Sequence, residues 1–318
     1  MIRFQSTHAD LLAGYIQHKR SLGFKFNYDY SFAQFDRFLL ENNYTNISLD
    51  KEICRKWEEK RPNETDANRY QRVGLVHNYA VYLQKLGYET CVPEHFYNFR
   101  SDFAPYIFSR AEIMSFFKAC DSTQDRLQSP AYPAFFRLVY GCGLRCSEAV
   151  GLKIKDYDME AMTIIVRESK NKTERILPVS KSLKVVLDAY VYKYRNSAGP
   201  EETLFVTRHN SSLSHNAIYT RFRQILEASG ISHGGRGKGP RIHDLRHSFS
   251  VHTLAEIAES GKDIYVFLPY LSKYLGHKSI EATEGYVRLT SELYPSLMER
   301  VNSYCSYIYP EVNDDESQ

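Results

Sequence analysis

Three short segments in the second half of the chain carry residue types that could bind and attack a phosphate ester. The first is GCGLRCSEAVGL at 141–152, whose glycines suggest a tight bend before a helix. Arg145 and Glu148 lie three residues apart on that helix, so the carboxylate can steady the guanidinium or a neighbouring imidazole. Taken alone, such a pair is usually a surface salt bridge.

The second segment, RIHDLRHSFSVHTL at 241–254, places His243 and Arg246 three residues apart near a predicted helix start. Backbone N–H groups at a helix N-terminus favour an anion, and a guanidinium can bind phosphate through two parallel hydrogen bonds. A solvated basic helix start is the alternative interpretation. We expect the other two histidines, His247 and His252, to pack or bond structurally rather than to react.

The third segment is YLGHKSIEATEGYVRL at 274–289, in which His277 precedes Tyr286 by nine residues. Gly276 is predicted to end one helix, and Tyr286 would lie inside the next, facing back toward His277. The chain has 25 tyrosines, so most must be core or surface residues. Tyr274 is a local rival for any reactive role.

These groups together would suit phosphoryl transfer to a tyrosine. Preorganised arginine and histidine donors can stabilise the charge that builds on the phosphate oxygens in the transition state. A phenol of pKa ~10 needs a proton acceptor before it attacks, and the leaving alkoxide needs an acid, for which a lysine among arginines is suited. The sequence contains no phosphate-binding glycine loop, dinucleotide fingerprint or H-E-x-x-H zinc motif, so we expect no cofactor and no metal.

Residues 1 to about 90 are predicted to form four helices and no strand. Apolar residues at helical spacing mark each of them, for example Phe32, Phe35 and Leu39 in the second. The stretch 91–103 has no periodicity and is predicted to be a linker. A new helix then begins at a capping box made by Ser109 and Glu112.

The rest of the chain is predicted to be mixed, giving a mainly α protein with a small antiparallel β-sheet. Met162–Arg167 and Arg175–Val179 should form a hairpin around the polar turn ESKNKTE. Helices are expected near 110–120, 130–141, from Arg145, 181–195, 214–229, 244–260, 264–275, 279–288 and 291–308, followed by an acidic tail at 311–318.

Composition limits the class of protein. The length of 318 residues favours two domains. The chain is 43% hydrophobic and 25% charged, without an apolar run of the ~18 residues that span a bilayer. Six cysteines without a C-x-x-C pair favour a reducing, cytoplasmic compartment and argue against a structural zinc site. The net charge of +3 argues only weakly for a nucleic-acid partner.

The ordered set of Arg145, a hairpin lysine, His243-x-x-Arg246, His277 and Tyr286 resembles the tyrosine recombinase (phage integrase) family. The resemblance covers 104–310, an integrase-like catalytic domain of α+β class. The helical region 1–90 resembles the core-binding, DNA-binding domain that precedes it in this family.

The resemblance implies a role for each matching residue. Arg145 and Arg246 match two arginines that bind the non-bridging oxygens of a DNA phosphodiester. Lys170 matches a lysine in a hairpin turn that protonates the leaving 5′ oxygen. Lys172 is the alternative, because this turn lacks both glycines of the family's pattern and its register is open.

The remaining matches complete the site that the resemblance implies. His243 matches a histidine that accepts a proton or binds the phosphate, and His277 matches a hydrogen-bond donor to the phosphate. Glu148 matches an acidic residue that supports the site. Tyr286 matches the nucleophile, which forms a 3′-phosphotyrosyl bond.

The implied substrate is double-stranded DNA at specific recombination sites, bound by a homotetramer, alone or with a second recombinase or an accessory DNA-bending protein. Basic residues in both regions could clamp the duplex. The candidates are Lys19, Arg20, Arg69, Arg72, Lys172, Arg236 and Lys238, with Lys153, Lys155, Arg175 and Arg241 among the other cations of the second region. The alternatives are a type IB topoisomerase, which shares the chemistry, and a DNA-binding regulator without catalysis.

Overall fold

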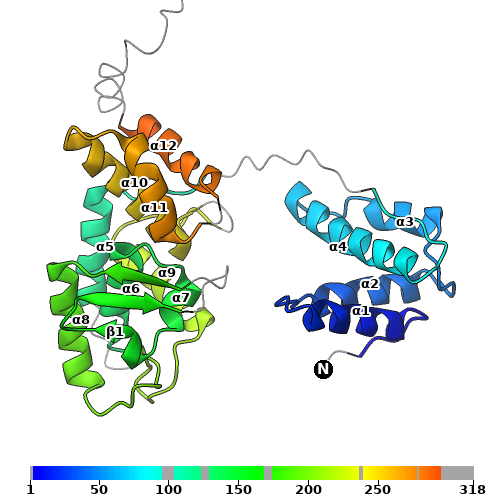
Figure 1. Cartoon of the computed structure of the whole chain (residues 1–318), viewed down its shortest axis with the longest axis horizontal. Helices are drawn as coiled ribbons and strands as arrows, with labels where there is room; N and C mark the ends of the chain where they lie inside the picture. The colour runs from blue at the N-terminus through cyan, green and yellow to red at the C-terminus, as the bar shows by residue number, and fades with distance from the viewer. Residues whose placement is uncertain are drawn as a thin grey trace, which may run out of the picture. The chain divides into compact units, whose positions relative to one another are not determined.

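The computed structural model describes residues 3–94, 104–122, 129–167, 174–235, 239–277 and 279–294. The chain divides into two compact units, Met1–Phe103 and Ala104–Gln318 (Figure 1). Within the described residues, no helix is both long enough and apolar enough to cross a membrane. The predicted linker falls mostly on residues outside the described ranges.

The described part of the first unit, 3–94, contains four helices, as the sequence predicts. They are α1 (Ala9–Ser21), α2 (Asp29–Glu41), α3 (Lys51–Glu58) and α4 (Asp66–Lys85). The side chain of Asp50 caps α3, and that of Thr65 caps α4. Aromatic side chains fill the core, where Tyr15 and Tyr79 pack edge to face with ring centroids 5.5 Å apart. These two tyrosines are therefore packing residues.

The second unit carries the remaining elements in a mainly helical fold with one small sheet. They are α5 (Arg110–Ser122), α6 (Tyr132–Gly141), α7 (Cys146–Val150), the 3₁₀ turn η1 (Ile154–Asp156), β1 (Tyr157–Asp158), β2 (Thr163–Val166), β3 (Arg175–Pro178), α8 (Lys181–Tyr194), α9 (His215–Ala228), α10 (Ile242–Glu259), α11 (Ile264–Leu275) and α12 (Glu281–Leu293). The predicted capping box at the start of α5 is present, since Glu112 N–H donates to Ser109 Oγ over 3.2 Å and Ser109 N–H donates to Glu112 Oε2 over 2.8 Å.

The predicted hairpin is confirmed, with β2 and β3 antiparallel and Val166 opposite Arg175. The short strand β1 adds to the other edge of β2, giving the order β1-β2-β3. The sequence did not predict β1 because two residues are too few to show an alternating pattern. The hairpin turn, 168–173, lies outside the described residues, so Lys170 and Lys172 are not placed.

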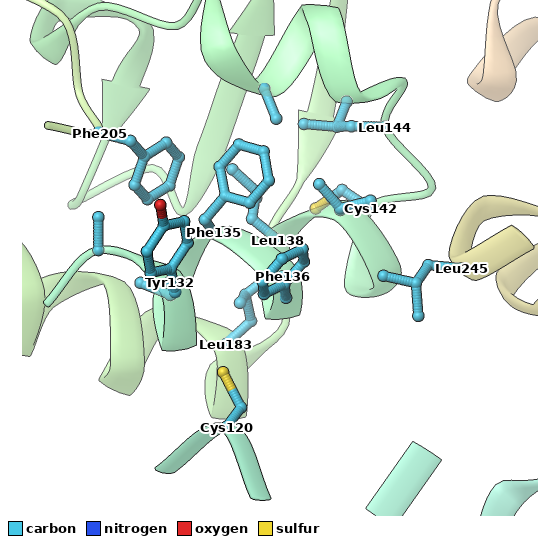
Figure 2. Close-up of a cluster of buried hydrophobic side chains, with 14 of the residues drawn as sticks. Cys120, Tyr132, Phe135, Phe136, Leu138, Cys142, Leu144, Leu183, Phe205 and Leu245 are labelled. Carbon is cyan, nitrogen blue, oxygen red and sulfur yellow. The ribbon is translucent and has the colours of Figure 1, made fainter. Parts of the chain in front are cut away.

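Two hydrophobic clusters hold the second unit together. The larger one surrounds α6, whose Phe135 and Phe136 are fully buried beside Phe205 and Leu183 (Figure 2). The smaller one joins α10, α11 and α12, which gather at one end of the unit in Figure 1. The segments with candidate site residues come from both clusters.

The end of α12 differs from the expectation. Two helices were predicted, at 279–288 and 291–308, but a single helix runs from Glu281 to Leu293. Thr290 does not break it, because its buried hydroxyl donates to the backbone carbonyl of Tyr286 over 2.7 Å. Residues 295–308, and with them the predicted C-terminal helix, lie outside the described ranges.

Candidate active site

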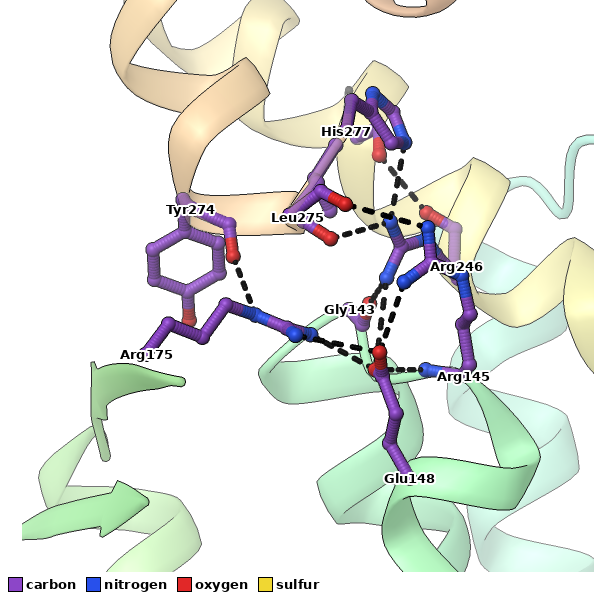
Figure 3. Close-up of polar contacts among 10 residues, drawn as sticks. Gly143, Arg145, Glu148, Arg175, Arg246, Tyr274, Leu275 and His277 are labelled. Carbon is purple, nitrogen blue, oxygen red and sulfur yellow. Dashed lines mark hydrogen bonds and ion pairs between the residues drawn. The ribbon is translucent and has the colours of Figure 1, made fainter. Parts of the chain in front are cut away.

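A buried carboxylate, that of Glu148, lies at the centre of the polar contacts between the elements of the second unit (Figure 3). Its side chain is 1% exposed. Oε1 accepts a hydrogen bond from Arg145 Nη1 over 2.8 Å, and Oε2 accepts one from the Arg145 backbone N–H over 2.9 Å. The predicted Arg145–Glu148 pair is therefore present, but it is not a surface salt bridge.

Arg175, the first residue of β3, binds the same carboxylate from the opposite side. Its Nη2 lies 2.7 Å from Glu148 Oε2 and its Nη1 lies 3.2 Å from Oε1. The sequence had placed Arg175 among the cations of a solvated DNA-facing surface. That interpretation is wrong, because the side chain is only 9% exposed and its charge is neutralised inside the protein.

Arg246 on α10 is the largest fully buried side chain of the unit. Its Nη1 donates to the carbonyl of Gly143 over 2.8 Å, and its Nη2 donates to the carbonyl of Leu275 over 2.7 Å. Burial lowers the pKa of Arg246 to about 10, so the guanidinium is still charged at neutral pH. It lies 3.9 Å from Glu148 Oε2.

Three guanidiniums thus surround one carboxylate. Burial alone would raise the pKa of Glu148, but hydrogen bonds from Arg175 and Arg145 outweigh it and lower that pKa below the ordinary value. With Glu148 ionised, one negative charge faces the positive charges of Arg145, Arg175 and Arg246. The excess of positive charge makes this region suited to bind an anion.

Two glycines allow these groups to meet. Gly143 has φ +58°, and a Cβ there would lie 2.5 Å from a ring carbon of Phe249. Gly276 ends α11 with φ +67°, and a Cβ there would lie 3.1 Å from Arg175 Nη1. The predicted glycine stop of this helix is confirmed.

His277 follows this turn and faces the arginines. Its Nε2 lies 3.0 Å from Arg246 Nη2, and its Nδ1 lies 2.8 Å from Thr283 Oγ1. A guanidinium can only donate, so Nε2 is the acceptor and Nδ1 carries the proton. Desolvation and then the charges of Arg246 and Arg145 lower the pKa of His277 to about 4, so the ring is neutral at pH 7.

Tyr286 on α12 faces back toward His277, as the spacing predicts. The two rings are stacked with centroids 6.1 Å apart and planes at 22°. The tyrosine is 5% exposed. Desolvation raises the pKa of its phenol, while the charges of Arg246 and Arg145 act in the opposite direction.

The phenol of Tyr286 is hydrogen-bonded to a residue that the sequence did not predict to be catalytic. His247 Nδ1 lies 2.9 Å from Tyr286 Oη, and the ring of His247 meets that of His243 edge to face at 4.6 Å. Desolvation, and then the charges of Arg241 and Arg246, lower the pKa of His247 to about 4. Desolvation, and then the neighbouring His247 and Arg246, lower the pKa of His243 to about 4. His252 fits the expectation of a structural histidine, since its Nδ1 bonds Tyr140 Oη.

The structure therefore brings together the predicted residues of three separate segments. These are Arg145, Glu148, His243, Arg246, His277 and Tyr286. Arg236 and Lys238, like Lys170 and Lys172, lie outside the described residues. Among the described residues, no group of three or more histidine, cysteine, aspartate or glutamate side chains is placed to hold a metal ion.

In the first unit the predicted DNA-contacting cations have different surroundings. Lys19 lies over the ring of Tyr15, Arg20 pairs with Asp29, and the Nε of Arg69 donates to the carbonyl of Glu58 over 2.7 Å.

The expectation that Arg72 contacts DNA at the surface is wrong. Its guanidinium pairs with Glu64 over 2.7 Å, lies over the ring of Trp57 and is 9% exposed. Its guanidinium is therefore held within the first unit rather than presented to DNA.

Comparison with known proteins identifies the family. The phage integrase family matches residues 107–292, more than half of the chain. The chain belongs to the phage integrase family. It is accordingly a tyrosine recombinase, an enzyme that cleaves and rejoins DNA strands at specific sites. The resemblance inferred from Arg145, His243, Arg246, His277 and Tyr286 is confirmed at the level of the family.

Relatives differ in how much of their length this recombinase matches. "Putative integrase/recombinase y4rB" of Sinorhizobium fredii is 29% identical over 93% of this chain and 97% of that protein. Tyrosine recombinase XerA of Pyrococcus horikoshii is also 29% identical, over 59% of this chain and 58% of that protein. The XerH site-specific recombinase, solved in a post-cleavage complex with its difH substrate, is 17% identical and has a TM-score of 0.64 over 87% of this chain and 78% of that one. This likeness confirms the predicted fold class.

Proposed function

We propose that this recombinase cleaves duplex DNA by attack of Tyr286 on a phosphodiester held by Arg145 and Arg246. The observation that carries the proposal is the excess positive charge around Glu148 next to a tyrosine whose hydroxyl is bonded to a neutral imidazole. A phosphodiester is an anion whose transition state concentrates charge on its non-bridging oxygens, so fixed guanidinium donors stabilise the transition state more than the ground state.

His277 would complete the phosphate site once the anion is bound. In the free protein its Nε2 accepts from Arg246, and the nearby cations keep it unprotonated. A bound phosphate opposes those cations, which raises the affinity of Nε2 for a proton. His277 can then donate to a phosphate oxygen, while Thr283 continues to hold its Nδ1.

The proton and bond changes balance as follows. The Tyr286 Oη–P bond forms, the P–O5′ bond breaks, and the phenolic proton passes to His247, with His243 as the alternative acceptor. The leaving O5′ takes a proton from Lys170, or from Lys172 if the turn has the other register. The 3′-phosphotyrosyl bond conserves the energy of the phosphodiester, so rejoining to another strand needs neither ATP nor a metal ion.

The proposed substrate, assembly and domain roles follow from this reaction. The substrate would be duplex DNA with specific sites, exchanged in a homotetramer, alone or with a second recombinase or a DNA-bending protein. We propose the first unit, 1–90, as a core-binding domain joined through 91–103 to the catalytic domain 104–310, with an acidic tail at 311–318. The protein would act in the cytoplasm, on nucleoid DNA. Integration or excision of a mobile element and resolution of DNA are equally compatible with this chemistry.

A nicked suicide substrate tests the reaction itself. Cleavage near the nick releases a short strand and prevents rejoining, so a covalent protein–DNA adduct should accumulate in EDTA and without nucleotide. The adduct should resist denaturation and should leave a free 5′-hydroxyl on the released strand. Cleavage that requires a divalent cation, or that leaves a 5′-phosphate, would contradict the proposal.

His247→Gln should slow adduct formation by about 10²-fold or more, the usual contribution of a general base. The amide cannot take up the phenolic proton, although it can still hydrogen-bond Tyr286. The matched control is His252→Gln on the same helix, whose imidazole Nδ1 bonds another phenol, that of Tyr140, over 2.8 Å. Single-turnover cleavage rates measure both variants, and equal rates for the two would remove His247 from the mechanism.

A further inference from the structure

Arg175 is the described residue through which the hairpin is joined to the catalytic elements. It is the first residue of β3 and follows the turn that contains Lys170 and Lys172, which lie five and three residues before it in the sequence. The strand β3 is an edge strand, bonded only to β2 among the described strands. The edge strand is therefore held on one side by its pairing with β2 and elsewhere by the contacts of its side chains.

The side chain of Arg175 reaches two elements outside the sheet. Its Nη1 and Nη2 bind both oxygens of Glu148, and its Nε donates to the carbonyl of Tyr274 over 3.0 Å. Gly276 lies so close to the guanidinium that no Cβ fits there without a shift. One side chain therefore links β3 to α7 and to the last turn of α11, which ends two residues before His277.

These contacts also exclude a direct role for Arg175 on the substrate. All three guanidinium nitrogens are engaged within the protein, and the side chain is 9% exposed. Arg145, which binds the same carboxylate, is 20% exposed and has a freer guanidinium edge. Because a guanidinium fork fixes distance and orientation at once, Arg175 is suited to hold Glu148 rather than to bind phosphate.

We propose that Arg175 is a positioning residue that holds the hairpin bearing the general acid in register with the phosphate-binding arginines. The proposal rests on the function proposed above, in which Lys170 or Lys172 protonates the leaving oxygen. Fully extended chain spans at most about 3.5 Å per residue, so a lysine five residues from Arg175 has its backbone within ~18 Å of this anchor. Without the anchor the lysine would sample many positions and would less often meet the leaving oxygen.

The test changes the leaving group, because this distinguishes a defect in protonating the leaving atom from a defect in binding the phosphate. Suicide substrates are prepared with the ordinary bridging 5′ oxygen or with sulfur in its place. A thiol of pKa ~8.5 leaves as the thiolate without protonation, so the sulfur substrate bypasses the general acid. In both cases the Tyr286 Oη–P bond forms, and either the P–O or the P–S bond breaks.

Arg175→Met should lower single-turnover cleavage of the ordinary substrate by about 100-fold, in the range of a lost general acid. On the sulfur substrate the variant should stay within about threefold of the wild type. The matched control is Arg167→Met, an arginine on the other side of the same turn that pairs with Asp156 over 2.6 Å and does not touch Glu148. This control should cleave both substrates at the wild-type rate.

Two outcomes would overturn the proposal. An equal loss of cleavage rate on both substrates would assign Arg175 to the phosphate site or to stability. An unchanged cleavage rate on the ordinary substrate would show that Arg175 does not position the acid. If Arg175→Met does not fold, Arg175→Lys is tested instead. Lysine retains the charge but lacks the guanidinium's paired donors, so the variant should again cleave the sulfur substrate better than the ordinary one, with a smaller difference in rate. Lys170→Ala and Lys172→Ala are measured in parallel. If sulfur rescues neither, the general-acid assignment fails, and this failure is distinct from a failure of Arg175.

Discussion

Replacing Tyr286 with phenylalanine is expected to abolish the covalent protein–DNA adduct while leaving DNA affinity unchanged. Loss of an enzyme nucleophile costs on the order of 10⁶ in rate, so no adduct should be detectable. The ring stays in place, because its stacking on His277 does not involve the hydroxyl. The lost hydrogen bond to His247 should cost only about 1 kcal/mol of stability.

Tyr274→Phe is the matched control for this experiment. Tyr274 is a second tyrosine of the same segment and is partly buried, and its pKa is raised by burial and by the neighbouring Cys142 thiol. Its backbone carbonyl, which Arg175 binds, is unaffected by the substitution. This variant should form adduct at the wild-type rate. An adduct that persists in Tyr286→Phe and disappears in Tyr274→Phe would reverse the assignment.

Glu148→Gln should be the most destabilising single substitution in the site. The amide has nearly the same shape, but it removes the carboxylate with which both Arg145 and Arg175 form ion pairs. Removing one partner of a buried ion pair typically costs about 3–5 kcal/mol, because the remaining charges are left uncompensated. For a domain of this size each kcal/mol shifts Tm by roughly 2–4 °C, so thermal unfolding should show a shift near 10 °C.

A matched glutamate separates the effect of burial from the loss of charge. Glu201 also pairs with two cations, Lys153 and Lys155, but it is 64% exposed. Water and salt screen that pair, so Glu201→Gln should leave Tm unchanged. An equal loss of stability in both variants would show that the Glu148 network has no special role.

Millimolar sulfate should also raise the Tm of Glu148→Gln more than that of the wild type. An added divalent anion can compensate the guanidiniums that the substitution leaves unpaired. Sodium chloride at the same ionic strength is the reference, because it supplies screening without a doubly charged oxyanion. An equal response of the two proteins to sulfate would indicate that the loss of stability comes from packing rather than charge.

Most of the fold could be predicted from the sequence because its signals are local. Apolar spacing and caps such as that made by Ser109 and Glu112 act within a few residues, so they can be recognised without tertiary structure. The same applies to the turn at Gly276 and to the direction in which Tyr286 faces. The short strand β1 and the unbroken end of α12 were missed because pairing and burial, rather than local propensity, determine them.

The contacts that complete the site could not be predicted in this way. Arg175 meets Glu148 across 27 residues of sequence, and His247 meets Tyr286 across 39. Nothing in either residue's neighbourhood distinguishes it from a solvated arginine or a packing histidine. The resemblance assigned roles to the residues that match the family's catalytic set, and it assigned none to Arg175 or His247.

The identity of the residue bonded to DNA tests the central claim most directly. Trypsin cuts after Lys273, Lys278 and Arg288, so the two candidate tyrosines fall on separate peptides, 274–278 and 279–288. Mass spectrometry of the trapped adduct, after nuclease digestion, should find the added nucleotide phosphate on peptide 279–288, which contains Tyr286 alone among tyrosines. A modified peptide 274–278, or a modification at any residue other than Tyr286, would contradict the account.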